Sequence, residues 1–287
     1  MMVGLLDTAD HLNARQFLIA VKKLADTLNY GTDKSPYLGS GIEYAQSRPY
    51  QWGDSIRSID WKLTARTGKF FVKEYEAPKC LPCYLLLDTS ASMTISSVSK
   101  SKYAIGVHIA GGLAFACLDR VSPVGILGVG GRDIRVQPSL SRGQILQWLH
   151  RLRTFRYDEP TTLGRRVSEL APTLPSRCLI VVLSDLQDDT ALPALKLLAQ
   201  QHDTVVLQLR DPAEQGIPGT GFLQAGEAET GRTFVTVGRR TWIDRDRGLQ
   251  QLKRAGVDHL VLPTEKPFAA NLRNFLAARG VLGRGKR

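Results

Sequence analysis

The chain has 287 residues, enough for one or two domains with a sizeable core. Apolar residues make up 43% and charged residues 23%, which is ordinary globular usage and excludes a largely disordered, collagen-like or coiled-coil protein. The formal net charge is +11, but six basic residues follow Glu265, where no acid occurs, so much of the excess is a basic C-terminal tail rather than a nucleic-acid-binding surface across the fold.

The segment 1–79 differs in pattern from the rest of the chain. Apolar side chains recur at helical spacing over residues 8–29, where Thr8 is a candidate N-cap. A stretch rich in Gly, Ser and Tyr follows, and short strands are expected around residues 41–44 and 70–75. We therefore interpret residues 1–79 as an N-terminal extension.

From residue 80 onward, apolar strands alternate with helical patterns. The predicted strands are 84–87, 124–129, 178–183, 204–209 and 258–262, and the predicted helices are 102–118, 141–152, 163–170, 191–201, 242–255 and 267–278. Uninterrupted apolar strands are typical of a parallel sheet covered by helices on both faces. The alternation therefore predicts a doubly wound, Rossmann-like α/β domain with a mainly parallel sheet over residues 80–287.

Residues 211–238 interrupt this alternation. The segment is rich in Asp, Pro, Gly and Glu, and it ends with a short alternating strand at residues 233–237. We expect a β-hairpin-like insertion there.

No targeting or disulfide signal is apparent. The chain opens without the basic segment and apolar run of a signal peptide, and its longest uncharged stretch, residues 103–118, is too short for a membrane span. A cytoplasmic protein is therefore expected. Cys80 and Cys83 form a lone CxxC pair that precedes a strand instead of opening a helix, so we interpret them as small, partly buried side chains.

Polar residues follow the first strand of the α/β domain. Asp88, Ser90 and Ser92 are spaced two residues apart, so in an extended loop their side chains point the same way. In open parallel sheets, ligands bind outside the carboxyl ends of the strands, which is where this loop lies. One carboxylate and two hydroxyls are hard oxygen donors of the kind that Mg²⁺ or Mn²⁺ prefers.

Two further segments supply oxygen donors at the same edge of the sheet. Asp185 follows the strand at 178–183, and Thr161 precedes the helix at 163–170. Thr162 is the alternative to Thr161, since the sequence leaves the register of that loop open. An Asp before Ser residues is also common at ordinary turns, but the convergence of three segments favours a metal site.

The segment at residues 88–93, DTSASM, resembles the metal-ion-dependent adhesion site of von Willebrand factor type A (vWA) domains. The ligand positions of that site are matched here by Asp88, Ser90, Ser92, Thr161 and Asp185. The resemblance implies a bound Mg²⁺ whose coordination is completed by an Asp or Glu of a partner protein.

A second resemblance covers nearly the whole chain. Residues 48–66, RPYQWGDSIRSIDWKLTAR, resemble the signature of the DUF58 family, and the flanking residues 39–44 and 72–76 also fit. Many members carry N-terminal membrane helices, whereas none is expected in this chain. The resemblance implies an adaptor or co-chaperone that works with a MoxR-type AAA+ ATPase in protein complex assembly or metal insertion.

The signature segment combines charged residues with two tryptophans. Its polar members can form an ion-pair and hydrogen-bond network around Trp52 and Trp61. The network members are Asp54, Arg57, Asp60, Lys62 and Arg66. We expect this network to pin the N-terminal extension onto the α/β domain, and a partner-docking face is the alternative.

Several catalytic signatures are missing from the sequence. It has no P-loop, no glycine-rich dinucleotide motif that opens a helix and no HExxH zinc motif. Neither Ser90 nor Ser92 has an evident base that would make it a nucleophile. We therefore predict a non-enzymatic protein without catalytic residues. A Mg²⁺-dependent hydrolase of phosphatase or nuclease type, and nucleic-acid binding through the basic C-terminal tail, are the alternatives.

Overall fold

The chain forms two compact units. The structure, a computed structural model, describes residues 3–5, 14–29, 38–39, 43–76, 81–174, 176–215, 222–226, 233–237 and 245–279. One unit comprises residues 1–30 and 81–275, and the other comprises residues 31–80 and 276–287. This division differs from the predicted boundary after residue 79, because the segment 1–30 groups with the α/β unit.

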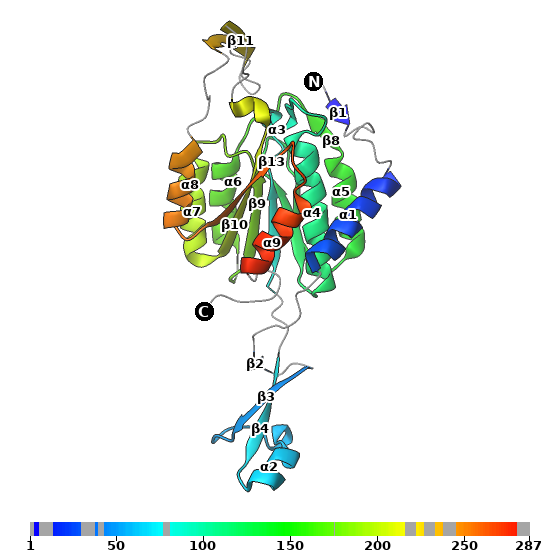
Figure 1. Cartoon of the computed structure of the whole chain (residues 1–287), viewed down its shortest axis with the longest axis vertical. Coiled ribbons are helices and arrows are strands. Elements are labelled where there is room, and N and C mark those ends of the chain that lie inside the picture. Colours follow the sequence, from blue (N-terminus) through cyan, green and yellow to red (C-terminus); the bar gives the residue numbers. More distant parts are fainter. Residues whose placement is uncertain are drawn as a thin grey trace. The chain divides into compact units, whose positions relative to one another are not determined.

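A six-stranded sheet forms the centre of the α/β unit (Figure 1). Its strands are β5 (Cys83–Leu87), β6 (Val124–Gly128), β7 (Arg135–Ser139), β9 (Leu179–Ser184), β10 (Asp203–Arg210) and β13 (Asp258–Pro263). They lie in the order β13-β10-β9-β5-β6-β7, and all neighbours are parallel except β7, which pairs antiparallel with β6. The five strands predicted from apolar runs are all present, and the doubly wound α/β fold class is confirmed.

Helices cover both faces of this sheet. The described helices outside the small sheet are α1 (Ala14–Asn29), α3 (Ala91–Thr94), α4 (Lys102–Asp119), α5 (Arg142–Leu152), α6 (Leu163–Leu170), α7 (Ala191–Gln201), α8 (Arg245–Arg254) and α9 (Ala269–Arg279), with short 3₁₀ helices η3 (Ala171–Thr173) and η4 (Pro212–Gln215). Helices α6, α7 and α8 lie on one side of the sheet, and α1, α4 and α5 lie on the other (Figure 1). The predicted helices of this domain are confirmed, with ends close to those expected.

Successive side chains of β5 point to opposite faces of the sheet. Leu86 belongs to the core under α6, α7 and α8, whereas Leu87 faces α4, where it lies beside Gly106. This alternation explains why the strand is apolar at every position, since both of its faces are buried. Among the helices in the described ranges, none is long and apolar enough to cross a lipid bilayer.

Two neighbouring glycines of α4 explain why the segment 1–30 joins this unit. A Cβ at Gly112 would lie 2.6 Å from Leu24 Cδ2, and one at Gly111 would lie 3.0 Å from Val21 Cγ1. Both contacted side chains belong to α1, and both are buried. The glycines therefore allow α1 to pack closely on α4. Strand β1 (Val3–Leu5) also pairs with β8 (Thr154–Arg156) of the same unit. The candidate N-cap Thr8 lies outside the described residues.

This close packing leads to a prediction for Gly112. The change Gly112→Ala is expected to lower the free energy of unfolding by about 1–2 kcal/mol, because the added methyl overpacks against Leu24 and outweighs the gain in helix propensity. The matched control is Gly143→Ala in α5, where the nearest atom to the new Cβ, Ser141 Oγ, is 3.7 Å away. The control should be neutral or stabilising in urea unfolding. Equal effects of the two changes would contradict close packing of α1.

The second unit contains a small antiparallel sheet. Its strands are β2 (Leu38–Gly39), β3 (Glu43–Pro49) and β4 (Phe71–Glu76), in the order β2-β4-β3. The connection from β3 to β4 contains a 3₁₀ turn, η2 (Ile56–Ser58), and a short helix, α2 (Trp61–Thr67). The strands expected around residues 41–44 and 70–75 correspond to β3 and β4, although residues 41–42 lie outside the described part of the chain.

The interruption after β10 contains the expected hairpin. Strands β11 (Phe222–Gly226) and β12 (Thr233–Val237) pair antiparallel within the predicted insertion at residues 211–238.

Candidate metal centre

The two predicted aspartates stand at the point where the strand order of the sheet reverses. β5, the first strand of the α/β core, lies between β6 and β9: the chain runs from β5 outward to β6 and β7, and then crosses back past β5 to β9 on its other side. Asp88 follows β5 and Asp185 follows β9, and the two side chains are buried at the same edge. This is the position in which doubly wound folds bind their ligands.

Asp88 is held by groups of both strands. Ser184 Oγ donates a hydrogen bond of 2.6 Å to Asp88 Oδ2, and the Ser90 backbone N donates one of 3.0 Å to Oδ1. Burial and the nearby charge of Asp185 raise the pKa of Asp88 to about 7, although hydrogen bonds from Ser184 and Ser90 oppose that shift. The Asp185 carboxylate therefore lies close enough to disfavour the charge of Asp88.

The two serines of the motif meet, but not in the way that the spacing predicts. Ser90 is extended, whereas Ser92 lies within the short helix α3 instead of an extended loop. A turn of backbone therefore brings their hydroxyls together, with 3.0 Å between Ser90 Oγ and Ser92 Oγ. Both serines are buried, and the Ser90 side chain hydrogen-bonds to Asp88, so Ser90 links this pair of hydroxyls to the Asp88 carboxylate in a region shielded from solvent.

The loop before α6 separates the roles of its two threonines. Thr162 Oγ1 lies 2.9 Å from the Val129 carbonyl oxygen and 3.0 Å from that of Gly130, and its hydroxyl donates to this pair. The Thr162 side chain thus fastens its loop to the end of β6. Thr161 is half-buried beside it. Because these bonds engage the Thr162 hydroxyl, Thr161 is the better candidate to face a metal ion, and that role stays a prediction.

Glu159 joins this loop to the loop that carries the predicted ligands, a role that sequence reasoning missed. Its Oε1 accepts hydrogen bonds from Thr89 Oγ1 at 2.6 Å and from the Arg132 backbone N at 2.8 Å. Its Oε2 accepts from Arg132 Nε at 2.8 Å, and its carbonyl oxygen accepts from Ala91 N at 2.7 Å. A side chain at Gly130 would collide with both Thr89 and Glu159, which explains the glycine there.

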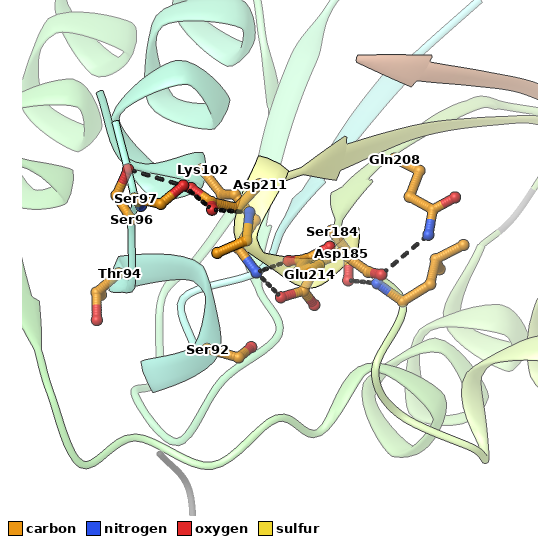
Figure 2. Close-up of polar contacts among 12 residues, drawn as sticks. Ser92, Thr94, Ser96, Ser97, Lys102, Ser184, Asp185, Gln208, Asp211 and Glu214 are labelled. Carbon is orange, nitrogen blue, oxygen red and sulfur yellow. Dashed lines mark hydrogen bonds and ion pairs between the residues drawn. The ribbon is translucent and has the colours of Figure 1, made fainter. Parts of the chain in front are cut away.

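Among the described residues, Asp185 is hydrogen-bonded through one of its two carboxylate oxygens. Its Oδ2 lies 2.6 Å from Lys102 Nζ, and Lys102 Nζ lies 2.5 Å from Glu214 Oε1 (Figure 2). Burial alone would lower the pKa of Lys102, but Asp185 and Glu214 together raise it above its ordinary value. Within the described part of the chain, the buried Asp185 Oδ1 has no hydrogen-bond partner. Neither Lys102 nor Glu214 was predicted as part of the site.

The charges and donors of this cluster fit a divalent cation. Asp88 lies near Asp185, and Lys102 pairs with Asp185 and Glu214, so these four groups carry an excess of two negative charges when all are ionised. Within the described ranges, no three His, Cys, Asp or Glu side chains could hold a metal ion by themselves. The two carboxylates would therefore need the serine hydroxyls as further oxygen donors, which is a set suited to Mg²⁺ or Mn²⁺.

Comparison with known proteins places the chain in a family. A family model described as "Protein of unknown function DUF58" matches residues 46–254, more than half of the chain. The chain belongs to the DUF58 family. The match runs from β3 of the second unit to the last residue of α8, so it includes both the signature segment and the candidate metal centre.

Mycobacterial relatives of this DUF58 protein extend over most of its length. The uncharacterized proteins Mb1516 of Mycobacterium bovis and Rv1480 of Mycobacterium tuberculosis are each 26% identical to it over 282 residues. The alignment covers 92% of this chain and 88% of each relative.

The two signature aspartates of this DUF58 chain find their partners within the second unit. Both Asp54 oxygens accept from the Arg48 guanidinium at 2.7 Å, and these bonds lower the pKa of Asp54 to about 2. Asp60 caps α2 by accepting from Leu63 N at 3.1 Å, and it accepts from Ser47 Oγ at 2.8 Å. Arg48 and Ser47, which were not predicted members, therefore anchor the network.

The two tryptophans and the basic members of the predicted network are exposed. Trp52 is wholly exposed and Trp61 is 61% exposed, so the aspartates do not form a network packed around the two rings. The remaining predicted members, Arg57, Lys62 and Arg66, also have exposed side chains. The role of the signature segment as a clamp stays a prediction, with a partner-docking face as its alternative. Of the CxxC pair, Cys83 is buried and free, and Cys80 lies outside the described residues.

Proposed function

We propose that this DUF58 protein is a non-enzymatic interaction module that recognises an acidic side chain of a partner through a bound Mg²⁺ or Mn²⁺. The proposed ligands are Asp88, Ser90, Ser92, Thr161 and Asp185, as in the vWA adhesion site that the sequence resembles. The observation that carries the proposal is the pair of buried carboxylates at the switch point, with two hydroxyls beside one of them and a buried oxygen of Asp185 that has no partner among the described residues.

The chain's own residues prepare this site. Ser184 and the Ser90 backbone fix both oxygens of Asp88, and the Ser90–Ser92 contact fixes the orientation of two hydroxyls. Glu159 keeps the Thr161 loop next to the ligand loop. When bound, the cation supplies a positive centre with an open position for a carboxylate. Preorganised ligands of this kind keep their geometry without further ordering, which favours binding.

The proposed partner is a MoxR-type AAA+ ATPase, with this protein as adaptor or co-chaperone in complex assembly or metal insertion. Membership of the DUF58 family supports this partner, because the resemblance of the sequence to that family implies it. A positive centre presented at the sheet edge suits a partner that offers an exposed Asp or Glu.

A capture experiment tests the proposal. Full-length protein is immobilised and exposed to the purified MoxR-type ATPase of the same genome, with Mg²⁺ or with EDTA. Capture should require Mg²⁺ and should be lost in the double variant Ser90→Ala/Ser92→Ala, whereas Ser168→Ala in α6 should leave it unchanged. Capture that is indifferent to both EDTA and the double variant would overturn metal-bridged binding. Phosphatase or nuclease turnover abolished by Asp88→Ala would instead support the hydrolase alternative.

The two threonines of the loop provide a matched test of the ligand set. Thr161→Val is expected to weaken Mn²⁺ binding, measured by calorimetry, by about tenfold or more. Thr162→Val should lower the free energy of unfolding by about 1 kcal/mol, because its hydroxyl bonds to the end of β6 are lost, and should change Mn²⁺ affinity by less than about threefold. The reverse pattern would assign the ligand role to Thr162.

A further inference from the structure

We infer that Lys102 and Glu214 set the cation affinity of the metal centre in opposite directions. In this inference Lys102 is a built-in positive charge that competes with the divalent cation for Asp185, and Glu214 is the counter-charge that weakens this competition. The inference rests on the proposed function, because it concerns the same site. Neither residue is a proposed metal ligand.

Lys102 is placed to compete. It is the first residue of α4, its side chain is only 3% exposed, and its ammonium lies 2.6 Å from Asp185 Oδ2. Figure 2 shows the ammonium between Asp185 and Glu214. A buried lysine is costly unless it is paired, and here both partners are carboxylates. In a buried region the charge of the ammonium is poorly screened, so it also acts on a cation bound at Asp185.

The contact with Lys102 occupies one of the two carboxylate oxygens of Asp185. Its Oδ2 belongs to Lys102, whereas the buried Oδ1 has no partner within the described residues. Asp185 therefore keeps one oxygen for a metal ion, while the positive charge of Lys102 offsets part of the negative charge of the Asp185 carboxylate. Without the ammonium, the full negative charge of Asp185 should act on the cation, so the cation should bind more tightly.

Glu214 is held in position by its own segment. It lies in η4, just after Asp211, and Asp211 accepts hydrogen bonds from the Ser97 backbone N at 2.9 Å and from the Ser97 hydroxyl. Asp211 also accepts from Ala213 N at 2.9 Å. Ser97 belongs to the loop that follows α3, which carries Ser92 (Figure 2). The segment that supplies Glu214 is thus fastened to the loop that follows α3, a few residues beyond the proposed ligand Ser92.

Opposite charges predict opposite effects. Lys102→Met removes a positive charge close to the cation, so Mn²⁺ should bind at least about tenfold more tightly. Glu214→Gln removes a negative charge and leaves the whole ammonium to Asp185, so Mn²⁺ should bind at least about tenfold more weakly. The double variant restores the net charge and should bind within about threefold of wild type. A purely structural role would weaken binding in both single variants.

The test is calorimetric titration of the full chain with Mn²⁺ alone. Lys100→Met, which removes an exposed lysine two residues away, is the matched control and should change affinity by less than about twofold. Circular dichroism checks folding. If Lys102→Met fails to fold, Lys102→Gln replaces it: its amide can still donate a hydrogen bond to Asp185 without the charge, and this variant should likewise bind Mn²⁺ at least about tenfold more tightly.

The outcomes separate the two proposals. If wild type binds Mn²⁺, Asp88→Ala abolishes binding, and Lys102→Met binds as tightly as wild type or less tightly, the inference is overturned and the metal centre stands. If Glu214→Gln binds as tightly as wild type or more tightly, the inference is also overturned. If wild type does not bind Mn²⁺ at all, the proposed metal centre itself fails, and the inference fails with it.

Discussion

The change Asp88→Asn is expected to stabilise the metal-free protein and to abolish its stabilisation by Mg²⁺. In EDTA at about pH 8, the free energy of unfolding should rise by about 1–3 kcal/mol, because a buried charge next to Asp185 is removed. The gain stays below the full cost of the charge, since an amide offers only one acceptor oxygen to the Ser184 hydroxyl and the Ser90 backbone.

The effect of this change should depend on pH with a definite sign. Burial and the charge of Asp185 raise the pKa of Asp88 from 3.8 to about 7, so the native state holds this proton more tightly than the unfolded state does. The stability of the metal-free wild type therefore falls as pH rises between those two values, and the whole cost is present above about pH 7. The advantage of Asp88→Asn should shrink toward about pH 4, as measured by urea unfolding across that range.

An exposed aspartate provides the control for this prediction. The Asp133 side chain is 84% exposed, so Asp133→Asn should change the free energy of unfolding by less than about 0.5 kcal/mol at any of these pH values. Destabilisation by Asp88→Asn in EDTA at about pH 8 would contradict the argument. It would mean that the hydrogen bonds of the Asp88 carboxylate with Ser184 and Ser90 contribute more to stability than the burial of its charge costs in the metal-free protein.

The α/β sheet could be predicted because its strands are buried on both faces. Cys178–Leu183 and the other apolar runs are continuous, and such runs are hard to read as anything but strands between helices. The edge strand β7 was missed for the opposite reason. Its residues Arg135–Ser139 are exposed or half-buried and include Pro138, so no apolar pattern marks them. An edge strand that faces solvent has little sequence signal of its own.

The packing of the segment 1–30 on the α/β core was also missed, although the sequence holds a signal for it. Gly111 and Gly112 lie in an apolar helix, and glycine is unfavourable there unless a neighbour must approach closely. The neighbour is α1 with Val21 and Leu24, far earlier in the chain. A pair of glycines shows that something packs closely, but not what packs there.

For the candidate site, too, the sequence predicted one set of residues and missed another. Asp88, Ser90 and Ser92 are local in sequence, so spacing and strand ends could predict them. The groups that position and balance them are distant: 83 residues separate Lys102 from Asp185, and 112 separate it from Glu214. Ion pairs between segments so far apart depend on how the chain folds. No spacing rule could have placed Lys102 beside Asp185.

The change Glu159→Gln is expected to destabilise the protein and to weaken the metal centre together. Glu159 is buried and accepts hydrogen bonds on both oxygens, from Thr89 and from two nitrogens of Arg132. An amide would place an NH₂ group against one of these donors and leave the partly buried guanidinium without its carboxylate, so the free energy of unfolding should fall by about 3 kcal/mol. Mn²⁺ affinity should fall about tenfold, because Glu159 ties the Thr161 loop to the loop of Asp88.

The control for this prediction is Glu169→Gln, which removes an exposed carboxylate from α6. It should change neither the free energy of unfolding nor the free energy of Mn²⁺ binding by more than about 0.5 kcal/mol. If Glu159→Gln lowers stability but leaves Mn²⁺ affinity unchanged, the Thr161 loop is no part of the metal centre, and the ligands reduce to those that follow β5 and β9.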